Sequence, residues 1–296
     1  MTNTLIGTDA LAGRLGDPAL VVVDVRHDLA QPERWGEAMY HQSHIPGARF
    51  VHLDRDLSAE RSGTNGRHPL PSREACEALF SRLGIDADCM VVVYDQGSGM
   101  FASRLWWMLR WLGHESVAVL DGGFEKWLRE GRAVDAELPV RRPASFSARH
   151  VGPLVLVDDL LVGKEANALT LVDARAPERF RGEVEPMDPV AGHIPGARNR
   201  YYADNLVPGG TFKPADMLRE EFAQLLGTTP LDQIVHYCGS GVTACHNLLA
   251  MEAAGLPGTG IYAGSWSEWC SDSARPVAVG AETDGTRDAH RAGESP

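Results

Sequence analysis

The stretch Ser-His-Ile-Pro-Gly-Ala-Arg at residues 43–49 recurs as Gly-His-Ile-Pro-Gly-Ala-Arg at residues 192–198. Val-Val-Asp-Val-Arg (22–26) recurs as Leu-Val-Asp-Ala-Arg (171–175), with the same displacement along the chain. Two further pairs follow in the same order: Val-Val-Val-Tyr-Asp (91–95) with Ile-Val-His-Tyr-Cys (234–238), and Asp-Gly-Gly-Phe-Glu-Lys-Trp (121–127) with Ala-Gly-Ser-Trp-Ser-Glu-Trp (263–269). Self-similarity in a fixed order indicates two copies of one structural unit.

Each copy contains three short, β-branched apolar runs separated by longer segments with helical periodicity. Strands that alternate with helices are typical of a mainly parallel sheet covered on both faces. We therefore predict an α/β fold of two tandem domains, each a mainly parallel sheet flanked by helices. The predicted strands are 21–25, 91–94 and 117–120 in the first copy, and 169–173, 233–237 and 259–262 in the second.

The predicted domain boundaries follow the repeat. Residues 1–136 form the first domain and residues 152–280 the second. The proline-containing segment 137–151 between them suits a linker. The polar segment 281–296 contains few apolar residues and is predicted to be a disordered tail.

Composition and charge exclude several classes of function. The net charge of −12 argues against a general nucleic-acid surface, although a local arginine cluster can still bind a small anion. No apolar run reaches transmembrane length, and the N-terminus carries no basic segment followed by an apolar one. We therefore expect a cytoplasmic protein with neither nucleic-acid nor membrane partners. The five cysteines have no spacing typical of zinc or a disulfide framework, so neither metal nor cofactor is predicted.

One cysteine lies in a distinctive setting, the stretch His-Tyr-Cys-Gly-Ser-Gly-Val-Thr-Ala (236–244). A predicted strand ends at Cys238, and a tight loop leads into an apolar helical pattern. Ligands of open α/β sheets bind at the carboxyl ends of strands. Gly239 and Gly241 allow backbone N–H groups to turn inward, and the helix N-terminus adds positive potential. These features favour a thiolate and would hold an anion or a persulfide sulfur. The alternative is a buried structural cysteine.

The repeat supplies an internal comparison for this cysteine. In the first copy the place of Cys238 is taken by Asp95. Because a carboxylate cannot act as a sulfur nucleophile, we predict that only the second copy is catalytic. The remaining cysteines lack the strand–loop–helix setting and are predicted to be structural, namely Cys76, Cys89, Cys245 and Cys270.

Taken together, these segments resemble the two-domain rhodanese family over roughly residues 5–280. The loop Cys-Gly-Ser-Gly-Val-Thr (238–243) is similar to that of 3-mercaptopyruvate sulfurtransferases, whereas related thiosulfate enzymes usually carry basic residues just after the cysteine. The resemblance implies transfer of sulfur from a small anionic donor, 3-mercaptopyruvate, through a persulfide on Cys238 to a thiol, thioredoxin or cyanide, with release of pyruvate. The alternatives are a thiosulfate:cyanide sulfurtransferase and a non-catalytic sulfur-relay or binding module.

The resemblance also implies a catalytic relay. In the family's mercaptopyruvate enzymes the loop serine belongs to a Ser-His-Asp relay with residues of the first domain. The matching positions are Ser240, His68 and Asp54, with Asp56 as a nearby rival for the carboxylate. From the residues alone, His68 reads as a surface turn residue before Pro69.

A substrate-binding set follows from the same resemblance. Arg179 matches the arginine that family members place beside the loop, where its two parallel N–H donors suit a carboxylate. Mercaptopyruvate enzymes of this type usually carry a second arginine a few residues on, but this chain has Met187 at that place. One half of the substrate clamp is therefore missing or supplied by another residue. The remaining predicted substrate contacts come from the loop itself, Gly239, Gly241, Val242 and Thr243.

Overall fold

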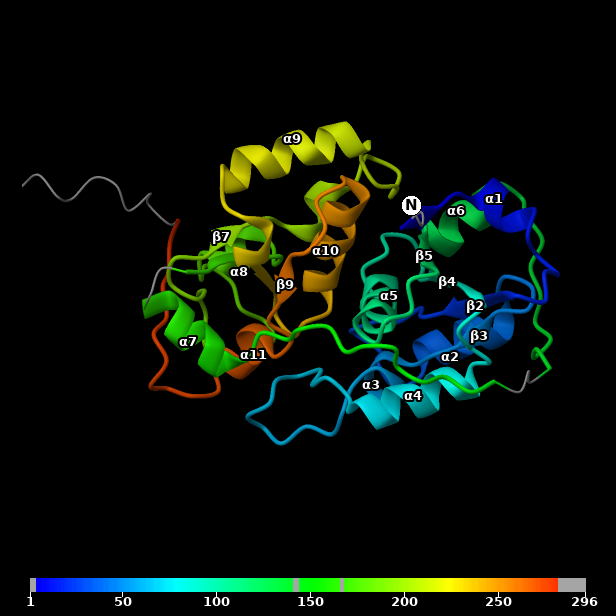
Figure 1. The fold of residues 1–296 in the computed structure, drawn as a ribbon, viewed down its shortest axis with the longest axis horizontal. Coiled ribbons are helices and arrows are strands. Elements are labelled where there is room, and N and C mark those ends of the chain that lie inside the picture. Colours follow the sequence, from blue (N-terminus) through cyan, green and yellow to red (C-terminus); the bar gives the residue numbers. More distant parts are fainter. Residues whose placement is uncertain (1–3, 141–143, 166–167, 282–296) are drawn as a thin grey trace, which may run out of the picture.

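The computed structural model describes residues 4–140, 144–165 and 168–281. The predicted tail from residue 282 onward, and residues 141–143 of the predicted linker, lie outside the described residues. Figure 1 shows two lobes, each built around one sheet with helices packed against it. The predicted fold class is thereby confirmed.

The first lobe contains a five-stranded parallel sheet in the order β1-β5-β4-β2-β3. Its central strands are runs of valine buried on both faces, as expected for a parallel sheet with helices on each side. The elements are β1 (Leu5–Ile6), α1 (Thr8–Ala12), β2 (Leu20–Asp24), α2 (Trp35–Gln42), β3 (Arg49–Phe50), α3 (Leu53–Asp56), α4 (Arg73–Arg82), β4 (Met90–Tyr94), α5 (Ala102–Trp111), β5 (Val117–Leu120) and α6 (Gly123–Arg129).

The second lobe repeats this topology in a four-stranded parallel sheet of order β7-β6-β8-β9, which matches β3-β2-β4-β5 strand for strand. The elements are α7 (Val157–Glu165), β6 (Thr170–Asp173), α8 (Pro177–Phe180), β7 (Arg198–Asn199), the 3-10 helix η1 (Tyr202–Asn205), α9 (Ala215–Leu226), the 3-10 helix η2 (Leu231–Gln233), β8 (Ile234–Tyr237), α10 (Thr243–Ala253), β9 (Gly260–Ile261) and α11 (Ser265–Trp269).

All six predicted strands are present, each within two residues of its predicted bounds. Three edge strands of two residues each were not predicted from the sequence, namely β1, β3 and β7. A strand of two residues is too short to show alternation of apolar and polar side chains, so it leaves no periodic signal. The equally short β9 (Gly260–Ile261) was predicted because the repeat matches it to β5.

The two lobes share one apolar core where α5 and α10 lie side by side (Figure 1). Trp106 and Leu105 of α5 are buried in the same cluster as Leu249 of α10. The loop between α3 and α4 leaves the first lobe and extends beneath the second, close to α11 (Figure 1). Residues of both lobes can therefore meet at the carboxyl ends of the strands.

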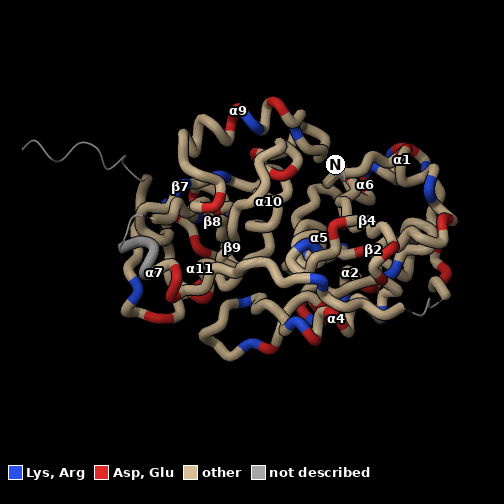
Figure 2. The backbone as a smooth tube through the Cα atoms, in the orientation of Figure 1, with Lys and Arg blue, Asp and Glu red and all other residues tan. Residues whose placement is uncertain are grey.

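Charge is distributed over the whole molecule. Figure 2 shows acidic and basic positions spread along both lobes rather than gathered in one of them. No helix in the described part of the chain combines the length and apolar character needed to cross a membrane.

Candidate active site

Cys238 lies directly after β8, in the tight loop that precedes α10. Its side chain is only 2% exposed, and its Sγ accepts a hydrogen bond from the Gly241 N–H at 3.2 Å. Gly241 has a φ of +77°, and a Cβ there would come within 2.2 Å of the Ala263 carbonyl oxygen. Only glycine fits this turn, and the turn is what aims the N–H at the sulfur.

The equivalent loop of the first lobe shows what this backbone conformation can hold. Asp95 is buried, and its carboxylate accepts hydrogen bonds from the backbone N–H groups of Gly97, Gly99, Phe101 and Ala102, at 2.8 to 3.2 Å. Burial raises the pKa of Asp95, while these four donors act in the opposite direction. The loop is thus a cradle of inward N–H groups, which in this copy is filled by the protein's own carboxylate.

A chain of hydrogen bonds connects the cysteine loop to the first lobe. Ser240 Oγ lies 2.7 Å from Nδ1 of His68, and His68 Nε2 lies 3.1 Å from Oδ1 of Asp54. Asp56 instead accepts from the His52 backbone N–H and from Arg82. The structure therefore brings Asp54, not its rival, to His68. His68 is buried against the second lobe and does not lie on the surface as an isolated turn residue would.

The pKa shifts of Asp54 and His68 indicate the protonation states along this series of hydrogen bonds. The hydrogen bond from His68 lowers the pKa of Asp54 to about 2, so Asp54 is ionised. Burial lowers the pKa of His68, and the charge of Asp54 offsets part of that effect. A neutral imidazole beside a carboxylate carries its proton on the nitrogen that faces it. His68 Nε2 therefore donates to Asp54, and Nδ1 accepts from the Ser240 hydroxyl.

The same carboxylate belongs to the one group of possible metal ligands among the described residues, His27, His52 and Asp54. His52 uses Nδ1 to accept the Asp54 N–H and Nε2 to bond the Pro32 carbonyl oxygen. Asp54 is engaged by His68 and also by Arg61 at 3.0 Å. The ligand atoms of His52 and Asp54 therefore already have partners, while His27 Nε2 lies 3.7 Å from Asp54 and has no hydrogen-bond partner among the described residues. His52 and Asp54 belong to a hydrogen-bond network that supports the relay.

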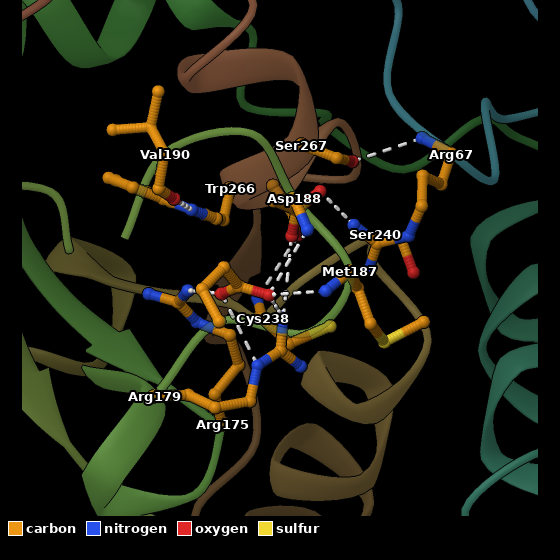
Figure 3. A network of polar contacts seen from close by, with 12 residues as sticks. Arg67, Arg175, Arg179, Met187, Asp188, Val190, Cys238, Ser240, Trp266 and Ser267 are labelled. Carbon is orange, nitrogen blue, oxygen red and sulfur yellow. Dashed lines mark hydrogen bonds and ion pairs between the residues drawn. The ribbon is translucent and has the colours of Figure 1, made fainter. Parts of the chain in front are cut away.

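Arginines surround the other side of Cys238 (Figure 3). Arg179 follows β6 on the short helix α8, and its guanidinium is held by Glu185 at 2.7 Å and by Asp188 at 3.4 Å. Arg175 pairs with Asp173 at 2.6 Å and with Glu185 at 3.4 Å, beneath the ring of Trp266. The predicted Arg179 therefore lies beside the cysteine loop and is fixed by two nearly buried acids.

Two arginines that the sequence analysis did not assign to the site also reach the cysteine loop. Arg67, from the loop between α3 and α4, lies against Gly239 and pairs with Asp188. Arg104 of α5 is fully buried and donates to the carbonyl oxygens of Gly241 at 3.1 Å and His68 at 3.3 Å. A charged residue at the start of the Trp-rich apolar stretch 104–111 is the signal that could have identified Arg104, because a buried charge requires partners.

Replacing Arg104 by Met is expected to destabilise the folded protein by about 2–4 kcal/mol, since buried carbonyl oxygens would lose their donor. The free energy of unfolding from urea titration measures this loss. Arg104→Lys keeps the charge but cannot reach carbonyl groups of both lobes, and should recover only part of the stability. A free energy of unfolding for Arg104→Met equal to that of the wild type would show that these hydrogen bonds do not stabilise the fold.

A cavity of about 310 Å³ opens beside Cys238 and is the right size for a small ligand. The predicted residues Ser240, His68 and Arg179 line it, with the loop residues Gly239, Val242 and Thr243. Its apolar wall comes from both lobes, through Leu29, Leu53, Met100, Phe101, Tyr201 and Tyr202. The site thus combines a buried sulfur, a relay on one side and guanidinium groups on the other.

Comparison with known proteins identifies the family to which the two domains belong. The family model "Rhodanese-like domain" matches the chain twice, at residues 8–130 and 156–272. A protein of Pseudomonas aeruginosa named "Probable 3-mercaptopyruvate sulfurtransferase" is 47% identical over 93% of this chain and 98% of its own length. The Mycobacterium tuberculosis protein "Putative thiosulfate sulfurtransferase SseB" is 40% identical, over 94% and 98%. The crystal structure of SseA, a 3-mercaptopyruvate sulfotransferase of Escherichia coli, superposes with a TM-score of 0.78 at 34% identity, covering 90% of this chain and 99% of that one.

Proposed function

The chain belongs to the rhodanese-like family and is a sulfurtransferase, and from this we propose that it moves sulfur from 3-mercaptopyruvate through a persulfide on Cys238. The observation that carries the choice of donor is the hydrogen-bonded chain Ser240–His68–Asp54 beside the cysteine loop. Mercaptopyruvate brings a proton that must move during the reaction, and thiosulfate does not.

The first step is attack of the Cys238 thiolate on the sulfur of mercaptopyruvate. A sulfur–sulfur bond forms, and the carbon–sulfur bond breaks with its electron pair moving into the substrate as the enolate of pyruvate. The Gly241 N–H, already directed at Sγ, stabilises negative charge there. By analogy with the Asp95 cradle, the inward N–H groups of this loop hold the outer, anionic sulfur of the persulfide.

The relay moves the proton from sulfur to carbon. Ser240 Oγ accepts the proton of the donor thiol while its own proton passes to Nδ1 of His68. The imidazolium that forms is stabilised by the ionised Asp54. The proton then returns through Ser240 to the enolate carbon, which gives pyruvate and a persulfide anion on Cys238. Atoms and charge balance with no proton taken from solvent.

The charge of the cavity also favours this donor. The formal charges of Arg67, Arg175 and Arg179 are cancelled by three acids that pair with them, Asp173, Glu185 and Asp188. A monoanion therefore adds a single negative charge next to the Cys238 thiolate. A dianion such as thiosulfate adds two, and these three paired arginines offer no surplus positive charge to meet the second.

Transfer of the outer sulfur completes the cycle. An acceptor thiol, thioredoxin or cyanide attacks this sulfur, and the sulfur–sulfur bond breaks with its electron pair returning to Cys238 as thiolate. Because Cys238 is almost fully buried, the persulfide is presented to acceptors within the cavity. This geometry favours a small nucleophile or an extended side chain over a broad protein surface.

Steady-state kinetics with both donors tests the choice of substrate. The value of kcat/KM is expected to be higher for 3-mercaptopyruvate than for thiosulfate, with the same acceptor and at the same pH. The runner-up is thiosulfate:cyanide sulfurtransferase, which the name of the Mycobacterium tuberculosis relative favours. A larger kcat/KM with thiosulfate would overturn our choice of donor and leave the family unchanged.

A further inference from the structure

The loop between α3 and α4 packs closely against the second lobe at Gly66. Gly66 has a φ of +85°, and a Cβ there would lie 2.8 Å from the carbonyl oxygen of Gly264. The next residue, Arg67, donates its backbone N–H to Ser267 Oγ at 3.0 Å. This docking fixes the backbone of Arg67 beside the cysteine loop, although Arg67 belongs to the first lobe and Cys238 to the second.

The Arg67 side chain converges with Arg179 on one face of that loop (Figure 3). At Gly239, the position of a Cβ would lie 2.7 Å from Nη2 of Arg67 and 3.6 Å from both terminal nitrogens of Arg179. Asp188 joins the two guanidinium groups, since one of its oxygens accepts from Arg67 and the other from Arg179. Two arginines from different lobes are thus held next to each other, beside the residue that follows Cys238.

Arg67 retains unused capacity to bind an anion. Its Nε is buried and has no hydrogen-bond partner among the described residues. Its side chain is 19% exposed and lines the cavity together with Cys238 and Arg179. A buried donor without a partner costs free energy, and a carboxylate entering the cavity would supply one.

We propose that Arg67 is the second guanidinium of the substrate clamp, so that the carboxylate of the sulfur donor is bound by one arginine from each lobe. This proposal rests on the proposed function and specifies its substrate as a small α-keto acid. It explains how Met187 is tolerated: Met187 lies at the cavity rim, 41% exposed, while the charge comes from across the lobe interface. Substrate binding then joins the two lobes, and Arg67 determines specificity for a carboxylate.

The kinetic test compares Arg67→Met with Arg73→Met, which removes an exposed arginine of α4 whose one ion pair among the described residues is with Glu77 in its own helix. Arg67→Met should raise KM for 3-mercaptopyruvate about ten- to hundredfold, the effect of losing a charge-assisted hydrogen bond, with kcat changed less than about threefold. Arg179→Met should behave alike. In the double variant with Met187→Arg, KM should fall back towards the wild-type value. A KM for Arg67→Met within about twofold of Arg73→Met would overturn the proposal.

A second measurement does not depend on the reaction. Iodoacetate and iodoacetamide both alkylate the Cys238 thiolate, but only iodoacetate carries a carboxylate. Peptide mass spectrometry measures the rate of each reaction. The ratio of the iodoacetate rate to the iodoacetamide rate should fall about tenfold in Arg67→Met and stay unchanged in Arg73→Met. An unchanged ratio in Arg67→Met contradicts the clamp. If the wild type forms no persulfide from mercaptopyruvate while the ratio still falls, the proposed function fails and the anion site stands.

Discussion

Cys238→Ser is expected to abolish sulfur transfer with every donor, because no other group in the cavity can form the persulfide. A hydroxyl at this position stays protonated at neutral pH and cannot displace a carbon from sulfur. After incubation with 3-mercaptopyruvate, the mass of the intact wild-type protein should increase by one sulfur atom, and that of Cys238→Ser should not. Pyruvate release, measured in the same samples, should likewise be lost.

Cys89→Ser is the matched control for this substitution. Cys89 is equally buried, but it lies in the first lobe just before β4, where its thiol donates to the Asp86 carbonyl oxygen at 3.4 Å, a bond that serine can replace. Cys89→Ser should gain one sulfur atom and release pyruvate as the wild type does. A wild-type protein that gains no sulfur from any donor would favour the remaining alternative, a non-catalytic sulfur-relay or binding module.

The fold was largely predictable because the chain contains two copies of one structural unit, which can be compared with each other. Two copies of the stretch around His44 and His193, at matching distances from the strand runs, imply two sheets of the same topology. The four strands of the second sheet follow the order of four of the five strands in the first. The same comparison singled out Cys238, because its counterpart is Asp95. The structure adds the physical reason for that substitution: Asp95 occupies the cradle of N–H groups, as a ligand would.

Two features of the site could not be predicted from the sequence, namely which aspartate pairs with His68 and the contact of Arg67 with the cysteine loop. Asp54 and Asp56 are both plausible by spacing, and only the packing of α3 against the loop that carries His68 distinguishes them. Arg67 precedes His68 directly, yet nothing local indicates that it crosses to Gly239. Arg67 and Gly239 are more than a hundred positions apart, so their contact depends on how the lobes dock rather than on any local pattern.

His68→Ala is expected to lower kcat with 3-mercaptopyruvate by about a hundredfold or more, within the range found for general acid–base groups. It removes the acceptor for the Ser240 proton, so the donor thiol proton can no longer pass to the enolate carbon. With thiosulfate the loss should stay below about tenfold, because sulfite leaves without needing a proton. Ser240→Ala should show the same contrast. Equal losses with both donors would remove the relay from the mechanism.

The dependence of kcat on pH tests the same relay without deleting it. The relay needs neutral His68, and burial lowers the pKa of His68, so the acid limb for mercaptopyruvate should lie below the ordinary histidine value of about 6.5. The carboxylate of Asp54 raises the pKa of His68, and Asp54→Asn removes that effect. The acid limb of Asp54→Asn should therefore shift to lower pH, while kcat on the plateau falls because the imidazolium loses its counter-charge. An acid limb that stays in place, or moves to higher pH, would mean that a group other than His68 carries the proton.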